Sequence, residues 1–150
     1  MKQLLLAGCI AGALATGLVA ATVAHAQQDE VSRYQAKRVG VVYFAVDSDE
    51  IDAEAKKVLD PLKARALADT KHIVILVHGH TEPNEAGNGP EYGMGLSQRR
   101  ASNVRAYLYP DSYLDDHNES IMQSFGESQP PADGGNARRV EIYFGNFPGS

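Results

Sequence analysis

Two apolar runs, residues 39–46 and 72–78, constrain the fold most strongly. Both are rich in Val, Ile and other large apolar side chains, and neither alternates apolar with polar residues. A short run of this kind is typical of a β-strand that is apolar on both faces. The sequence therefore predicts two such strands, and it places the strand at 72–78 in the centre of a sheet.

The segments around these runs complete the expected order of elements. Apolar residues recur at helical spacing after Asp52, a plausible N-cap, and again from about Leu96 to Tyr109. Two further strands are expected at 121–125 and 139–144, the latter with Val140, Ile142 and Phe144 on one face. The order β-α-β-α-β-β predicts an α/β two-layer sandwich in which two helices pack on a mixed four-stranded sheet.

A long glycine-rich loop, residues 79–95, is expected between the second strand and the second helix. Loops of this length inside a compact domain are usually functional. The loop therefore directs the search for a site to the end of the second strand.

The first residues resemble an export signal. Lys2 precedes an uncharged apolar stretch, which ends in the Ala24-His25-Ala26 sequence that a signal peptidase would cleave. We expect residues 1–26 to be a signal peptide, 27–38 a flexible segment and 39–146 one domain in the periplasm. Leu6-Ala7-Gly8-Cys9 also matches a lipobox, and lipidation of Cys9 would tether the protein to the outer membrane.

Composition excludes several classes of function. The chain has 19 acidic and 14 basic residues and a formal net charge of −5, which argues against nucleic acid or an anionic membrane as partner. Its one cysteine, Cys9, lies in the expected signal, so the mature chain would form no disulfide. No motif calls for a cofactor or for catalysis, and no transmembrane segment is expected after cleavage.

Arg100 is the most informative single residue. On a helical wheel it falls between Leu96 and Val104, in the middle of the apolar stripe of the second helix. A buried arginine must pair with an anion or face a cavity, because a lone buried charge is costly. The residues alone leave two hypotheses open: a ligand carboxylate, or an internal ion pair with Glu82, Asp47 or Glu141.

His78, His80 and Glu82 follow the second strand with two-residue spacing. If the chain stays extended there, the three side chains point the same way and could ligate Zn²⁺. A metal site is therefore an alternative hypothesis, set against ordinary loop polarity.

Five motifs together resemble the OmpA-like domain family, which includes the C-terminal domain of OmpA, the peptidoglycan-associated lipoprotein and the stator protein MotB. They cover about residues 39–145 in the family's order: Phe44-x-Val46-Asp47, Gly79-His80-Thr81-Glu82, Leu96-Ser97-x-x-Arg100-Ala101, Gly126-Glu127-Ser128-x-Pro130 and Arg138-Arg139-Val140-Glu141.

The resemblance implies non-covalent, non-enzymatic binding of peptidoglycan through the diaminopimelate of the stem peptide, as a module that anchors to the cell wall. Carried over by position, Glu82 would take the ligand's ammonium and Arg100 its carboxylate. The other residues expected at the site are Thr81, Asp47, Asn84 and Arg139.

The chain departs from the family pattern near this site. Glu82 stands where the family has aspartate, and the loop between it and Arg100 is about three residues longer than usual. A protein-interaction domain with lost or altered wall binding, with envelope proteins as partners, is therefore the second hypothesis for function.

Overall fold

A four-stranded mixed sheet forms the centre of the molecule in a computed structural model, which describes residues 30–68, 73–109 and 119–148. The strands are β1 (Lys37–Tyr43), β2 (Ile73–Gly79), β3 (Glu119–Ser124) and β4 (Arg139–Asn146). Their order in the sheet is β1-β4-β2-β3. β4 is antiparallel to both β1 and β2, whereas β2 and β3 are parallel. The predicted two-layer α/β architecture and the inner position of β2 are confirmed.

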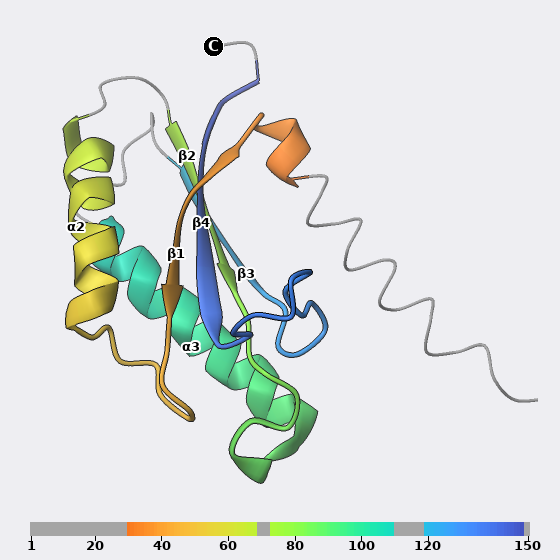
Figure 1. Cartoon of the computed structure of the whole chain (residues 1–150). Coiled ribbons are helices and arrows are strands. Elements are labelled where there is room, and N and C mark those ends of the chain that lie inside the picture. Colours follow the sequence, from red (N-terminus) through yellow and green to blue (C-terminus); the bar gives the residue numbers. More distant parts are fainter. Residues whose placement is uncertain (1–29, 69–72, 110–118, 149–150) are drawn as a thin grey trace, which may run out of the picture.

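Two helices, α2 (Ala53–Ala68) and α3 (Gly89–Leu108), pack on one face of this sheet (Figure 1). The Asp52 side chain accepts a hydrogen bond from the Ala55 backbone N–H at 2.8 Å, which confirms the predicted N-cap. The main core lies between the layers, and its strand residues include the predicted inner face of β4: Val140, Ile142 and Phe144.

The opposite face of the sheet is covered in part by residues before β1. Tyr34 is buried and packs with Val74 and Leu76, and its backbone carbonyl accepts a hydrogen bond from Asn146. Residues 27–38 were expected to be flexible, yet the described part of this segment packs on the sheet and β1 begins at Lys37. The expected signal peptide, with Cys9, lies outside the described residues.

The long loop is shorter than the sequence predicts. A short 3₁₀ helix, η1 (Glu85–Gly87), interrupts it, and α3 begins at Gly89 rather than near Leu96. Glycine and proline in this stretch have low helix propensity, so a prediction from sequence starts the helix too late. The consequence is that residues 80–88 form a compact connection between β2 and α3.

Contact between β2 and α3 fixes where the loop begins and ends. A Cβ atom on Gly79 would lie 2.1 Å from the backbone oxygen of Ser97, so only glycine allows the strand end and the helix to approach this closely. Because Arg100 lies one turn after Ser97, this contact brings its side chain to the end of β2.

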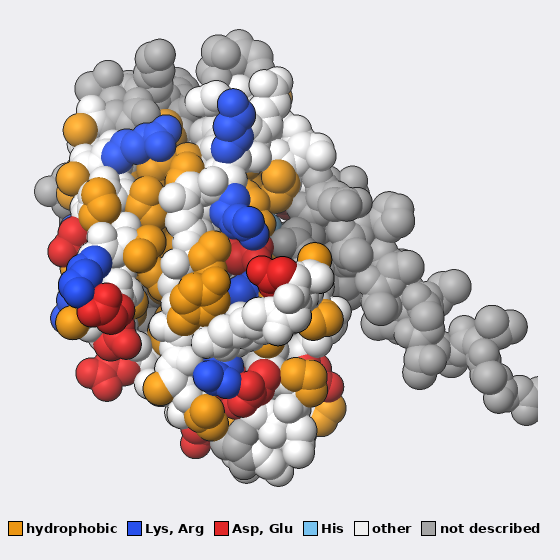
Figure 2. All heavy atoms as spheres, in the orientation of Figure 1, with side chains coloured by type: hydrophobic (Ala, Val, Ile, Leu, Met, Phe, Trp, Pro, Cys, Tyr) orange, Lys and Arg blue, Asp and Glu red, His pale blue; other side chains and the backbone are white. Residues whose placement is uncertain are grey.

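Surface charges are mixed on the face shown in Figure 2, where basic side chains lie scattered among acidic and apolar ones. None of the helices in the described ranges combines the length and hydrophobicity that crossing a bilayer requires.

Candidate ligand site at the end of β2

Arg100 is fully buried and uses all of its hydrogen-bond donors. Its Nε donates to the Ser48 backbone oxygen, and its Nη1 and Nη2 donate to the backbone oxygens of His80 and Ala45. Both terminal nitrogens also donate to the Glu85 carboxylate, at 2.9 and 2.5 Å. A guanidinium has five N–H donors, so none is left for another acceptor in this conformation.

The carboxylate of Glu85 sits in a cradle of four donors. Besides the two nitrogens of Arg100, the backbone N–H groups of Asp47 and Glu82 donate to it, at 2.8 and 3.4 Å. Burial by itself would raise the pKa of Glu85, but the hydrogen bonds from Arg100 and from these backbone groups lower it below the ordinary value. Both side chains of the pair are 0% exposed, so the cradle encloses the Glu85 carboxylate away from the protein surface.

Glu85 is the partner that the sequence did not single out. The internal ion pair was expected with Glu82, Asp47 or Glu141, and Asp47 and Glu82 take part only through their backbone N–H groups. Asn84 has a left-handed backbone, with φ 51° and ψ 38°, and forms the N-cap of the short helix η1. That turn returns the chain so that Glu85 points inward, and no periodic pattern in the sequence signals it.

Glu82 lies at the surface and pairs with Arg138. The two side chains are 34% and 24% exposed, and Glu82 Oε2 lies 2.5 Å from Arg138 Nη1. Arg138 is also held by a hydrogen bond from its Nε to the Phe44 backbone oxygen at 3.1 Å. The sequence motif contains Arg138, but only the structure shows that it, and not Arg100, contacts the Glu82 carboxylate.

An open groove of about 630 Å³ runs past this ion pair. Its other walls are Pro83 and the loop before β4, and among the residues that line it only Glu82 and Arg138 are charged. The remaining lining residues are Pro130, Pro131, Gly134, Gly135, Asn136 and Ala137.

Three other predicted site residues support this end of the sheet. Thr81 is buried, and its backbone N–H donates to Gly126. The Asp47 side chain accepts a hydrogen bond from the Tyr92 hydroxyl. The backbone N–H of Asn84 donates to Glu127 at 3.0 Å. These contacts hold the loop rather than project polar groups into the groove.

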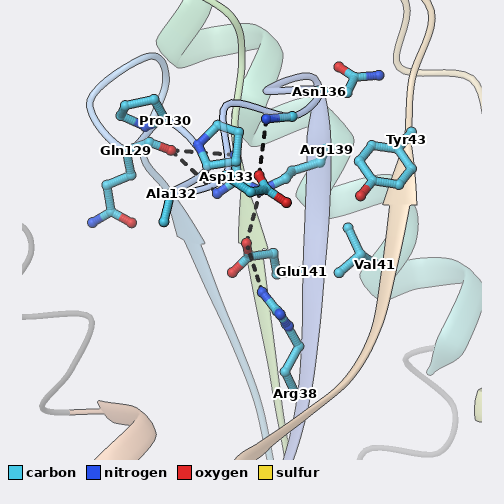
Figure 3. A pocket seen from close by; sticks show the side chains of 12 residues that line it. Arg38, Val41, Tyr43, Gln129, Pro130, Ala132, Asp133, Asn136, Arg139 and Glu141 are labelled. Carbon is cyan, nitrogen blue, oxygen red and sulfur yellow. Dashed lines mark hydrogen bonds and ion pairs between the residues drawn. The ribbon is translucent and has the colours of Figure 1, made fainter.

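Arg139 lies at a different place from the other predicted residues. Its Nε donates to Glu141 Oε1 at 2.8 Å, and both terminal nitrogens donate to the Gln129 backbone oxygen. Figure 3 shows it reaching from β4 toward the 129–137 loop, with Arg38 approaching Glu141 from β1. Arg139 lines a second groove, of about 440 Å³, which shares only part of its lining with the first. The shared residues are Pro130, Pro131, Gly135 and Asn136.

His78 and His80 do not form a metal site with Glu82. Both rings are buried and pack on Phe125, His78 edge-on and His80 stacked, whereas the Glu82 carboxylate is held by Arg138. Across the described residues, no group of three or more His, Cys, Asp or Glu side chains is placed to bind a metal ion. The zinc hypothesis therefore has no geometric support.

Comparison with known proteins matches this chain to one family. A family model described as the OmpA family matches residues 43–142. The chain is 36% identical over 94 residues to a peptidoglycan-associated lipoprotein of Haemophilus influenzae, covering 63% of this chain and 58% of that protein. It is 33% identical over 112 residues to a peptidoglycan-associated lipoprotein of Pseudomonas aeruginosa, covering 71% and 62%. The chain thus spans about 60% of the length of these relatives.

Solved structures agree with the fold. The peptidoglycan-associated lipoprotein of Burkholderia pseudomallei superposes with a TM-score of 0.50 at 26% identity, covering 72% of this chain and 90% of that chain. The C-terminal domain of Helicobacter pylori MotB superposes with a TM-score of 0.54 at 21% identity, covering 69% and 81%.

Proposed function

Because the chain belongs to the OmpA family, we propose that it binds peptidoglycan non-covalently in the periplasm and serves as a cell-wall anchoring module without catalysis. The relatives named peptidoglycan-associated lipoprotein support this assignment. Lipidation of Cys9 would add a membrane tether to the same function.

The ligand proposed is the diaminopimelate of the stem peptide, whose free centre carries an ammonium and a carboxylate. One observation carries this proposal: the cradle of Arg100 already holds a carboxylate, that of Glu85, in two-point contact with its guanidinium. Arginine binds carboxylates in this geometry with strong, directional hydrogen bonds. A ligand carboxylate that replaced Glu85 would meet the same four donors, and the displaced Glu85 side chain would regain its hydration in solvent.

Glu82 is proposed to accept hydrogen bonds from the ligand's ammonium. Its carboxylate lies at the groove and is about one-third exposed. The backbone N–H of the same residue donates a hydrogen bond to the Glu85 carboxylate, so Glu82 lies next to the cradle. Thr81, Asp47 and Asn84 keep this loop in place. Arg139, in the neighbouring groove, would contribute only to a ligand that extends across the 129–137 loop.

Co-sedimentation with purified sacculi tests the proposal. We expect the wild-type protein to sediment and Glu82→Gln to lose about tenfold in affinity, because one charge-assisted hydrogen bond is removed. Glu54→Gln is the matched control, since Glu54 is an exposed acidic residue of α2 that pairs with Lys57.

Two results would contradict this function. If the wild-type protein stays in the supernatant and an envelope protein is recovered with it instead, the protein-interaction hypothesis replaces wall binding. If sacculi release soluble muropeptides during the incubation, the module is an enzyme.

A further inference from the structure

One cation, Arg138, is among the residues that line the groove beside Glu82, and no part of the proposed function uses it. Arg138 donates through Nε to Phe44 and through Nη1 to Glu82. A guanidinium has five N–H donors, so three donors of Arg138 make no other hydrogen bond among the described residues, and Arg138 lines the groove. Arg100, in contrast, has no spare donor while Glu85 is bound.

The charges that surround Arg138 in the proposed complex indicate that it needs a new anionic partner when the ligand binds. In the proposed complex the Glu85 carboxylate has moved from the cradle into solvent, so the groups that contact the ligand are two cations, Arg100 and Arg138, and one anion, Glu82. The ligand's ammonium also competes with Arg138 for the Glu82 carboxylate. Arg138, whose side chain is only 24% exposed, would then have lost part of its counter-charge in a partly desolvated position.

We propose that Arg138 binds a second carboxylate of the same peptide. This inference rests on the proposed function and names its substrate class: a peptide segment with one ammonium and two carboxylates, of net charge −1. Arg100 takes one carboxylate, Glu82 takes the ammonium, and the free donors of Arg138 take the other carboxylate.

Shape and composition of the groove fit such a segment. Its volume of about 630 Å³ exceeds what a single amino-acid centre fills, and its far wall consists of proline, glycine, alanine and asparagine residues. Because these walls carry no charge, Arg138 is the one cation among the lining residues that can meet an anion there. The Nε–Phe44 hydrogen bond holds its guanidinium at the groove edge before ligand arrives.

The experiment uses a soluble peptide, L-Ala–γ-D-Glu–meso-diaminopimelate, titrated into the full domain by calorimetry. The peptide has three carboxylates: that of the free diaminopimelate centre, which Arg100 takes, that of D-Glu and the C-terminal one. Two further forms of the peptide carry an amide in place of either the D-Glu or the C-terminal carboxylate, the two candidates for Arg138. We expect one of these amidations to weaken binding to the wild-type protein about tenfold, as for the loss of one charge-assisted pair.

Variants at Arg138 decide whether this residue is responsible. Arg138→Gln should bind the parent peptide about tenfold more weakly than wild type and should no longer respond to the sensitive amidation. Arg138→Lys keeps the charge but not the planar fork, so an intermediate affinity is expected. Arg99→Gln is the control, because Arg99 is also a surface arginine paired with one carboxylate, that of Asp49.

Different outcomes separate this inference from the proposed function. If Arg138→Gln binds the parent peptide like wild type, or responds to amidation as wild type does, the inference is overturned while wall binding stands. If wild-type protein binds neither the peptides nor sacculi, the proposed function itself fails. Thermal unfolding of each variant excludes misfolding as the cause of a loss.

Discussion

At the scale of single residues, two arginines that each belong to an Arg-Arg pair in the sequence have different environments in the structure. Arg100 is enclosed, and its charge is neutralised by Glu85 inside the protein. Arg138 is partly exposed and pairs with Glu82 at the groove. The enclosed pair combines a fold role with the proposed binding role, so a single substitution cannot separate the two.

A double substitution separates them. Arg100→Ala alone should destabilise the domain by about 3–5 kcal/mol, because Glu85 would remain as a buried charge without a partner. Arg100→Met combined with Glu85→Leu removes both charges at similar volume, so no buried charge is left without a partner, and it should be more stable than Arg100→Ala. It should stay less stable than wild type, because the backbone groups that bonded to the two side chains lose their partners. Urea denaturation measures the stabilities, and sacculus co-sedimentation measures binding.

Binding of this double variant to sacculi shows whether the Arg100–Glu85 pair has a role beyond stability. A double variant that is folded under the assay conditions and yet fails to sediment places the carboxylate site at Arg100. A stable double variant that sediments normally would show that the Arg100–Glu85 pair serves the fold alone.

At the scale of elements, the contact between β2 and α3 positions the whole site. Backbone atoms of Gly79 and Ser97 approach so closely that a Cβ atom at Gly79 would overlap the Ser97 oxygen. The Ser97 hydroxyl in turn accepts a hydrogen bond from the Gly126 N–H at 3.1 Å, which ties the helix to the chain after β3. The start of α3 at Gly89 places Pro90 in the first turn of the helix, where proline is well tolerated because its missing N–H has no intrahelical partner.

Two glycine substitutions should therefore change the free energy of unfolding in opposite directions. Gly79→Ala should lower the free energy of unfolding by about 1–3 kcal/mol, because the strand end must move away from α3. Gly95→Ala lies within α3, where the nearest atom to its Cβ belongs to the flexible end of Arg99, at 3.6 Å. It should raise stability by about 0.5–1 kcal/mol. Urea denaturation compares both, and equal effects would contradict the close-contact argument.

At the scale of the whole molecule, two buried histidines couple stability to pH. Burial lowers the pKa of His78 to about 4 and that of His80 to about 3, with Arg139 lowering the latter further and Glu141 opposing it for both. Neither ring nitrogen of His80 has a hydrogen-bond partner among the described residues. Protonation of these rings in the folded protein is therefore unfavourable.

Acid should destabilise the domain from about pH 6.5 downward. The unfolded chain binds protons on these histidines near their ordinary pKa, whereas the folded protein does not, so stability is present above that pH and is lost as pH falls toward 4. We expect a loss of about 2–4 kcal/mol between pH 7 and 5. The lowered pKa values of Glu85 and Glu141 add to the loss below about pH 4.5.

Chemical denaturation at a series of pH values checks this dependence. His80→Leu removes one titrating group and its unpaired ring nitrogens, and should reduce the slope between pH 7 and 5 by about half. A slope unchanged in this variant would mean that other groups control acid stability.

Sequence by itself determined the architecture, because strand and helix periodicity are local consequences of which side chains are apolar. The central position of β2, the inner face of β4 and the burial of Arg100 all follow from such patterns. The sequence also indicated the family, since five motifs occur along the chain in the same order as in OmpA-like domains.

Tertiary structure alone decided which charges meet. Glu85 reaches Arg100 because of a left-handed turn at Asn84, and Arg138 reaches Glu82 across 56 residues of chain. Ion pairs between distant segments depend on loop conformation and strand order, which leave no periodic trace in the sequence. For that reason the sequence could propose Glu82 and Arg100 as a pair, whereas the structure assigns each of them a different partner.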